Sequence, residues 1–177
     1  MILACLLMLS LGGGPVYGVD SAQVDGYLKG LHTSNSTFSD RLVSVVRDGA
    51  GATYADGPLG EGPTGGYDSD PLIDLSKVDC VTFVEQSIAL AQGRDLAETT
   101  ALLQQIRYAG GRVDYATRNH FMLVDWVAHN PWCKETTTTL GVKSNELTRR
   151  ISMRDFFKLM KWNWPCARPP WLFSWVR

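Results

Sequence analysis

An unusually apolar segment near the middle of the chain limits how this protein can fold. Residues 80–92 read CVTFVEQSIALAQ and follow Asp79. Apolar side chains recur there at helical spacing, and aspartate is a favoured N-cap, so we predict a helix from Cys80 to Gln92. A helix this apolar is buried on most sides, and the rest of the chain has to cover it. The face that we expect to be buried carries Val81, Val84, Ile88 and Ala91, widened by Phe83 and Leu90.

Other segments predict further helices around this one. Residues 21–32 and 37–46 carry apolar side chains at helical spacing, with Ser36 or Thr37 as a cap for the second helix. Asp95, with Glu98 three residues later, begins another helix, which Gly110-Gly111 ends. A last helix is predicted to begin at Ser152.

The remaining segments predict little regular structure. Residues 48–70 are rich in glycine and proline and have too little alternation for a strand, so we predict a long loop. Val113 and Tyr115 indicate a short strand or extended segment. Residues 162–177 contain four tryptophans and three prolines, and we find no periodic pattern in them.

Composition limits the class of protein. A chain of 177 residues with 45% hydrophobic and 20% charged residues is typical of one soluble globular domain. The formal net charge of -1 gives no global basic field, so nucleic acid is not an expected partner.

The N-terminus reads as an export signal. The apolar run 2–11 is followed by Gly-Gly-Gly-Pro and by Val16-Tyr17-Gly18, which suit a signal-peptidase site. We therefore predict a signal peptide over 1–18, a domain over 19–177, and a periplasmic or cell-envelope location. The run is too short for a transmembrane span. Residues 2–5 also resemble a lipoprotein attachment box, which would make Cys5 a lipidation site.

Cys80 is the strongest candidate for chemistry. At the start of a helix, the unsatisfied N–H groups and the helix dipole favour a thiolate, and the same amides can hold an oxyanion. The alternative is a small buried hydrophobic residue. A disulfide between Cys133 and Cys166 would leave Cys80 free, and no cysteine pair has zinc-ligand spacing, so no metal site is expected.

A nucleophilic thiol needs a base, and the chain has three histidines, His32, His120 and His129. His32 is expected at the surface of the first helix. His120 lies between polar and apolar residues and is the default base, with Asp125 or Asn130 to orient its ring. The alternative for His120 is a structural or substrate-contacting residue.

Several motifs in one order resemble the N-acetylmuramoyl-L-alanine amidase-like family, a branch of the NlpC-type papain-like cysteine peptidase superfamily. The nucleophile motif matches at residues 79–85, and the loop before it matches at residues 59–62 and 67–72. A later signature matches at residues 106–108, 118–121 and 125–126. The resemblance implies an α+β papain-like fold, Cys80 as nucleophile and no cofactor.

The same resemblance implies that part of the family pattern is missing. The family carries its catalytic histidine downstream, in a Ser-His-x-Gly-Phe pattern, and this chain has no histidine after His129. We therefore expect a truncated domain, mostly the helical N-terminal half with the antiparallel sheet largely missing, and an aberrant tail over 162–177. A short variant that recruits His120 as base is the alternative. The segment with Arg118, His120, Asp125 and Trp126 is expected to bind substrate.

The expected activity is thiol-dependent hydrolysis of the amide between N-acetylmuramic acid and L-alanine, in peptidoglycan or muropeptides. The alternative is an inactive homologue or a muropeptide-binding module without turnover. A redox protein that uses Cys133 and Cys166 is a weaker idea, because neither lies at a helix start. A helix face left without its sheet would favour self-association.

Overall fold

The computed structural model describes residues 16–19, 21–35, 37–134, 136, 139–141 and 143. The chain divides into two compact units, residues 1–119 and 120–177, and each is described by itself. The helix predicted from Ser152, the segment 162–177 and Cys166 lie outside the described residues, as do residues 1–15.

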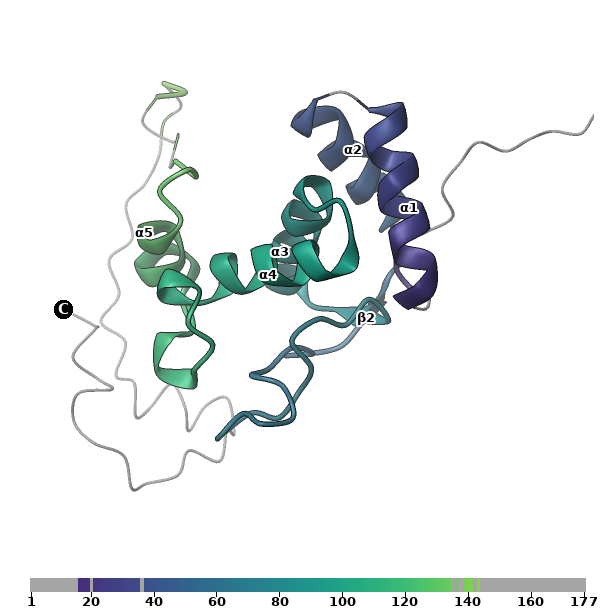
Figure 1. Cartoon of the computed structure of the whole chain (residues 1–177). Helices are drawn as coiled ribbons and strands as arrows, with labels where there is room; N and C mark the ends of the chain where they lie inside the picture. Colours follow the sequence, from purple (N-terminus) through teal and green to yellow (C-terminus); the bar gives the residue numbers. More distant parts are fainter. Residues whose placement is uncertain are drawn as a thin grey trace, which may run out of the picture. The chain divides into compact units, whose positions relative to one another are not determined.

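The first unit is α+β and rich in helix (Figure 1). Two short parallel strands, β1 and β2, pair with Thr53 opposite Lys77 and Tyr54 opposite Val78. The predicted loop over 48–70 therefore contains one short strand, which forms by pairing with a segment far along the chain. The elements of this unit are α1 (Ser21–Ser34), α2 (Phe38–Asp48), β1 (Thr53–Tyr54), β2 (Lys77–Val78), α3 (Cys80–Gln92) and α4 (Leu96–Arg107).

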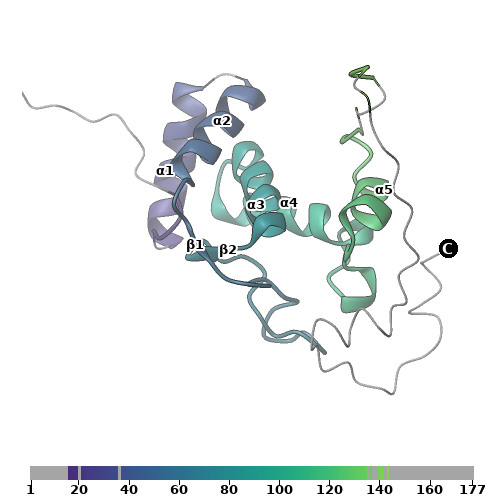
Figure 2. The same cartoon turned by 180° about the vertical axis from the view of Figure 1, so that it is seen from behind.

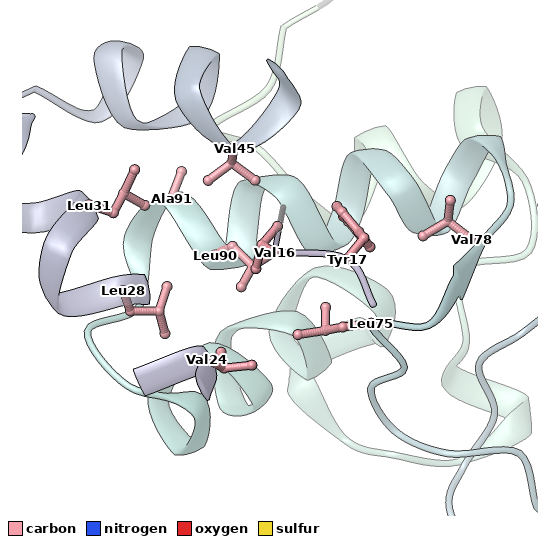
Figure 3. Packing of buried hydrophobic residues seen from close by; sticks show 10 residues of the cluster. All are labelled: Val16, Tyr17, Val24, Leu28, Leu31, Val45, Leu75, Val78, Leu90 and Ala91. Atoms are coloured by element: carbon pink, nitrogen blue, oxygen red, sulfur yellow. The ribbon is translucent and has the colours of Figure 1, made fainter. Parts of the chain in front are cut away.

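The apolar core of this unit lies among α1, α2, α3 and the segment before α1 (Figure 3). Val16 is 0% exposed and Tyr17 is 7% exposed. The Tyr17 ring packs against Phe83 of α3, with ring centroids 5.6 Å apart. The amide of Gly18 donates to the carbonyl of Leu75 at 2.6 Å. The three residues predicted to end a signal peptide are thus part of the folded unit. The core residues are Val16, Tyr17, Val24, Leu28, Leu31, Val45, Leu75, Val78, Leu90 and Ala91.

Helix α3 has the predicted bounds, but its buried face differs from the prediction. Val84 is 42% exposed, whereas Glu85 and Gln86 are 2% and 0% exposed. The apolar spacing was a poor guide because Glu85 pairs with the buried Arg107, and the Gln86 side-chain carbonyl oxygen accepts from the amide of Asp74. Cys80 and Val84, one turn apart on the same side of the helix, are both exposed.

The end of this unit also differs in detail from the sequence prediction. Helix α4 ends at Arg107, before the glycines expected to stop it, and a 3₁₀ turn (η1, Ala109–Gly111) follows. The extended segment predicted at Val113 and Tyr115 is wrong in part, because Tyr115–Thr117 forms a second 3₁₀ turn, η2. Asp114 caps this turn by accepting from the amide of Ala116.

The second unit is described mainly by a π-helical turn, η3 (Met122–Trp126), which continues into α5 (Val127–His129). Trp126 is 3% exposed and meets Trp132 edge to face, with centroids 5.8 Å apart. In the described part of the chain, no helix combines the length and the apolar character needed to cross a bilayer.

Candidate active site

Cys80 is the first residue of α3, and its side chain is exposed. Asp79 caps the helix: one carboxylate oxygen, Oδ1, accepts from the amides of Val81 and Thr82 at 2.9 and 2.7 Å. The Thr82 hydroxyl accepts in return from the Asp79 amide at 2.9 Å, which completes a capping box. The cap fixes the start of the helix and therefore the position of the thiol.

These bonds leave one amide at the helix start for a ligand. The amides of Val81 and Thr82 are taken by the Asp79 side chain, and the amide of Phe83 donates to the Asp79 carbonyl at 2.9 Å. The amide of Cys80 itself finds no acceptor among the described residues. The sequence predicted that several helix amides could hold an oxyanion, whereas in the structure only the Cys80 amide remains available for this at the helix start.

The chain between β1 and β2, which contains a loop over residues 57–72, begins beside the start of α3. The second carboxylate oxygen of Asp79, Oδ2, accepts from the amide of Gly57 at 3.2 Å. The amide of Ala55 donates to the carbonyl of Val78 at 2.9 Å, which extends the pairing of β1 with β2. Figure 2 shows the two strands side by side, with β2 leading into α3. Residues 53–57 therefore lie beside the residues that lead into Cys80.

A buried ion pair joins α3 to α4 and to this loop. Arg107 donates to a Glu85 carboxylate oxygen at 2.9 Å and to the Leu59 carbonyl at 3.1 Å. The Glu85 and Arg107 side chains are 2% and 6% exposed, so each charge has its partner in a site largely closed to water. The Tyr108 hydroxyl donates to the Gly60 carbonyl at 2.9 Å. Arg107, the last residue of α4, and Tyr108, which follows it, thus bind the carbonyls of two consecutive loop residues.

A second charge cluster holds the far part of the loop. Arg118 forms ion pairs with Glu61 and, at 2.8 Å, with Asp68. The guanidinium also lies over the Tyr115 ring, 5.4 Å from its centroid. Burial raises the pKa of Glu61, although the charge of Arg118 acts in the opposite direction. Both terminal nitrogens of the Arg118 guanidinium thus bind carboxylates of the loop.

The other predicted site residues fall in the second unit. His120 is exposed, and its backbone amide donates to the Asp125 carboxylate at 2.9 Å. The other oxygen of Asp125 accepts from the Phe121 amide at 2.8 Å, so this side chain holds the start of η3. Trp126 is buried and packs against Trp132. The structure thus unites Cys80 with the loop and Arg118 in the first unit, and His120 with Asp125 and Trp126 in the second.

His32 is not the simple surface residue that the sequence predicts. It is half-buried, and its Nε2 lies 3.0 Å from the carbonyl of Gly93, at the end of α3. The described residues contain no group of three or more His, Cys, Asp or Glu side chains arranged to hold a metal ion.

Comparison with known protein families identifies a match that includes the candidate site residues. The model of the N-acetylmuramoyl-L-alanine amidase-like family, called AmiA-like, matches residues 45–157. The chain belongs to the AmiA-like family. The matched range contains Cys80, both charge clusters and the predicted residues of the second unit.

A crystal structure supports the family membership. The chain is similar to protein LPG0564 from Legionella pneumophila str. Philadelphia 1, of the family model DUF1460, with 33% sequence identity and a TM-score of 0.56. The match covers 64% of this chain and 40% of that one, so the chain spans less than half the length of this relative. No curated protein gives a significant match.

The description of the matched family refers to N-acetylmuramoyl-L-alanine amidases. No role was predicted for Glu61, Asp68, Glu85 or Arg107 from the sequence. The available signal was their position inside the recurring motifs, since all four lie in segments that carry the family resemblance.

Proposed function

We propose that this AmiA-like chain is a cell-wall amidase with an NlpC-type papain-like mechanism, in which Cys80 is the nucleophile. The substrate would be the amide between N-acetylmuramic acid and L-alanine, in peptidoglycan or a muropeptide. The observation that supports this most is an exposed thiol at the capped start of a largely buried helix, inside the range matched by the family.

The reaction that follows from this proposal has two stages. The Cys80 thiolate attacks the carbonyl carbon, so that a C–S bond forms, and the carbonyl oxygen accepts from the free amide of Cys80. The C–N bond breaks, and the L-alanine nitrogen leaves as an amine after taking the proton that the thiol gave to a base. Water then hydrolyses the thioester, which releases the muramoyl carboxylate and restores the thiol.

The base in this scheme is a histidine, and His120 is our candidate within the described residues because its side chain is exposed. We also propose His120, Asp125 and Trp126 as substrate contacts, of which Trp126 offers little surface to a ligand because it is 3% exposed. A location outside the cytoplasmic membrane follows from the substrate and stays a proposal, as do the signal peptide and lipidation of Cys5.

The test is release of free L-alanyl peptide from N-acetylmuramoyl-L-alanyl peptide. We expect Cys80→Ala to lower kcat/KM at least about a thousandfold, because the covalent route is lost. Cys133→Ala, which removes the half-buried thiol of the second unit, should leave it within about twofold. Equal activity of Cys80→Ala and the unchanged protein would rule out the nucleophile, and tight muropeptide binding without release would support a binding module.

The same assay examines the base. We expect His120→Ala to lower kcat about a hundredfold or more, which is a larger effect than loss of a substrate contact alone would have on muropeptide binding. His129→Ala is the matched control from the same unit. Full activity of His120→Ala would assign the base to another residue and leave the role of Cys80 standing.

A further inference from the structure

The loop over residues 57–72 is held at many points by residues that the proposed chemistry does not use. Its two arms hydrogen-bond to each other: the amides of Gly60, Glu61 and Gly62 donate to the carbonyls of Pro71, Asp68 and Asp70 at 2.8 to 3.0 Å. The amide of Gly65 donates to the carbonyl of Gly62 at 2.8 Å, which closes the tip. A loop with this many internal bonds has one preferred shape.

Close packing of the backbone requires glycine at one point in the loop. A Cβ on Gly60 would lie 2.8 Å from the amide nitrogen of Asp70 and would also collide with the Asp68 carboxyl. Gly62 has a φ of 79°, in the left-handed region that favours glycine. These glycines let the two arms approach closely enough to bring the carboxylates of Glu61 and Asp68 to one place.

Arg118 binds both carboxylates from a distant part of the chain. Its sequence separation is 57 residues from Glu61 and 50 from Asp68. The Arg118 side chain is 15% exposed, against 3% for Glu61 and 25% for Asp68. Loss of one partner from a charge pair that is mostly shielded from water leaves the other charge buried alone, which destabilises the protein more than loss of a surface pair does.

Arg118 is itself fixed by the fold. It forms an isolated antiparallel bridge with Tyr108, and the next residue, Asn119, donates its amide to the carbonyl of Arg107 at 2.8 Å. The guanidinium therefore sits where α4 ends, beside the two side chains that hold the carbonyls of Leu59 and Gly60. The loop is thus bonded to the end of α4 through the carbonyls of Leu59 and Gly60, and to Asp79 through the amide of Gly57.

We propose that Arg118 is a positioning residue for the Cys80 site: with Glu61 and Asp68 it sets the shape of loop 57–72, and the loop presents the muramoyl peptide to the thiol. This rests on the proposed amidase function. Arg118 was expected to contact substrate, but its two terminal nitrogens bond to the carboxylates of Asp68 and Glu61, so we assign it a role that acts through the loop. The loop can affect the reaction because its first residues are bonded to the residue that caps the nucleophile helix.

The experiment compares Arg118→Met with Arg112→Met in the full chain. Arg112 is a matched control because its side chain is 74% exposed and its nearest carboxylate oxygen, on Asp114, lies 3.8 Å away. We expect Arg118→Met to raise the rate of limited proteolysis within residues 62–67 about tenfold or more, because the loop opens locally. Labelling of Cys80 by a small thiol reagent should stay within about twofold, since the cap of α3 is intact.

The kinetic readout separates positioning from a general structural role. We expect KM for N-acetylmuramoyl-L-alanyl peptide to rise at least about fivefold, with kcat changed less than about threefold. Arg118→Lys keeps one charge and should restore part of the difference. Asp68→Asn removes the charge of the more exposed of the two carboxylates that bind Arg118. It gives a milder variant if Arg118→Met does not fold, and it should also speed loop cleavage.

The outcomes are distinguishable. Faster loop cleavage without any amidase activity in the unchanged protein would keep the role of Arg118 in the loop and reject the proposed function. Loop cleavage, KM and labelling all equal to those of Arg112→Met would overturn the positioning role. So would a parallel rise of Cys80 labelling and loop cleavage in both Arg118→Met and Asp68→Asn, because that would show global loosening.

Discussion

Val16 and Tyr17 are two side chains that decide where the folded unit begins. Both are buried, and burial raises the pKa of the Tyr17 phenol to about 12. An added Cβ on Gly49 would lie 2.8 Å from the Tyr17 ring, so the ring fits closely against α2. Cleavage of an export signal after Gly18 would remove both side chains from the core. We propose that any such cleavage occurs before Val16.

This can be measured with two chains, one that begins at Val16 and one that begins at Val19, each after an initiating methionine. Full burial of an apolar side chain contributes about 1.5–3 kcal/mol, so we expect the shorter chain to lose about 3–5 kcal/mol of unfolding free energy. Urea unfolding followed by circular dichroism gives the difference. Equal midpoints for the two chains would show that residues 16–18 do not stabilise the unit.

At the scale of elements, the start of α3 depends on Asp79 more than an ordinary helix depends on its cap. Asp79 accepts from the amides of Val81, Thr82 and Gly57, whereas Asp95 of α4 accepts from the amide of Glu98. The Asp79 side chain thus joins the helix that carries Cys80 to the loop that we propose holds the substrate.

Loss of an N-cap side chain costs about 1 kcal/mol, so we expect Asp95→Ala to lower the free energy of unfolding by about that amount. We expect Asp79→Ala to lower it by about 2 kcal/mol, because Asp79 also accepts from the loop amide of Gly57. Asp79→Ala should in addition speed proteolysis of loop 57–72, and Asp95→Ala should not. Chemical denaturation and limited proteolysis check both points. An identical loss for the two caps, with the loop equally protected, would contradict the double role of Asp79.

Elements whose signals are local were predictable from the sequence. The bounds of α3 followed from Asp79 and the apolar spacing, and Thr37 caps α2 as one of the two expected residues. The exposed position of Val84 was not predictable, because the burial of Glu85 depends on Arg107, 22 residues later. The shape of loop 57–72 likewise depends on Arg118, which lies 57 residues after Glu61 and 50 after Asp68 in the sequence, and no local propensity reports such a bond.

The candidate site was predictable in the same uneven way. Cys80 stood out because helix starts activate thiols, and the structure adds that a single free amide remains beside it. The roles of Asp125 and Trp126 were harder to predict, because spacing does not reveal that one holds a turn and the other fills a core. The second parallel strand, two residues long, gave no periodic signal at all.

At the scale of the whole molecule, the described residues form two compact units, and the family match runs through both. The unit with Cys80 carries the nucleophile, its cap and the loop with its charge clusters. The proposed base, His120, lies in the other unit. Covalent catalysis by Cys80 is therefore the central proposal, because the cap, the loop and the proposed base are each assigned a role in the reaction of that thiol.

Intact-mass spectrometry tests that claim most directly. The protein is mixed with N-acetylmuramoyl-L-alanyl peptide, quenched with acid within milliseconds to seconds, and digested to locate any added group. We expect a mass increase equal to the N-acetylmuramoyl acyl group, attached to Cys80 and absent from Cys80→Ala, together with stoichiometric release of L-alanyl peptide. Release of that peptide at the same rate by Cys80→Ala, with no acyl group on the unchanged protein, would contradict it.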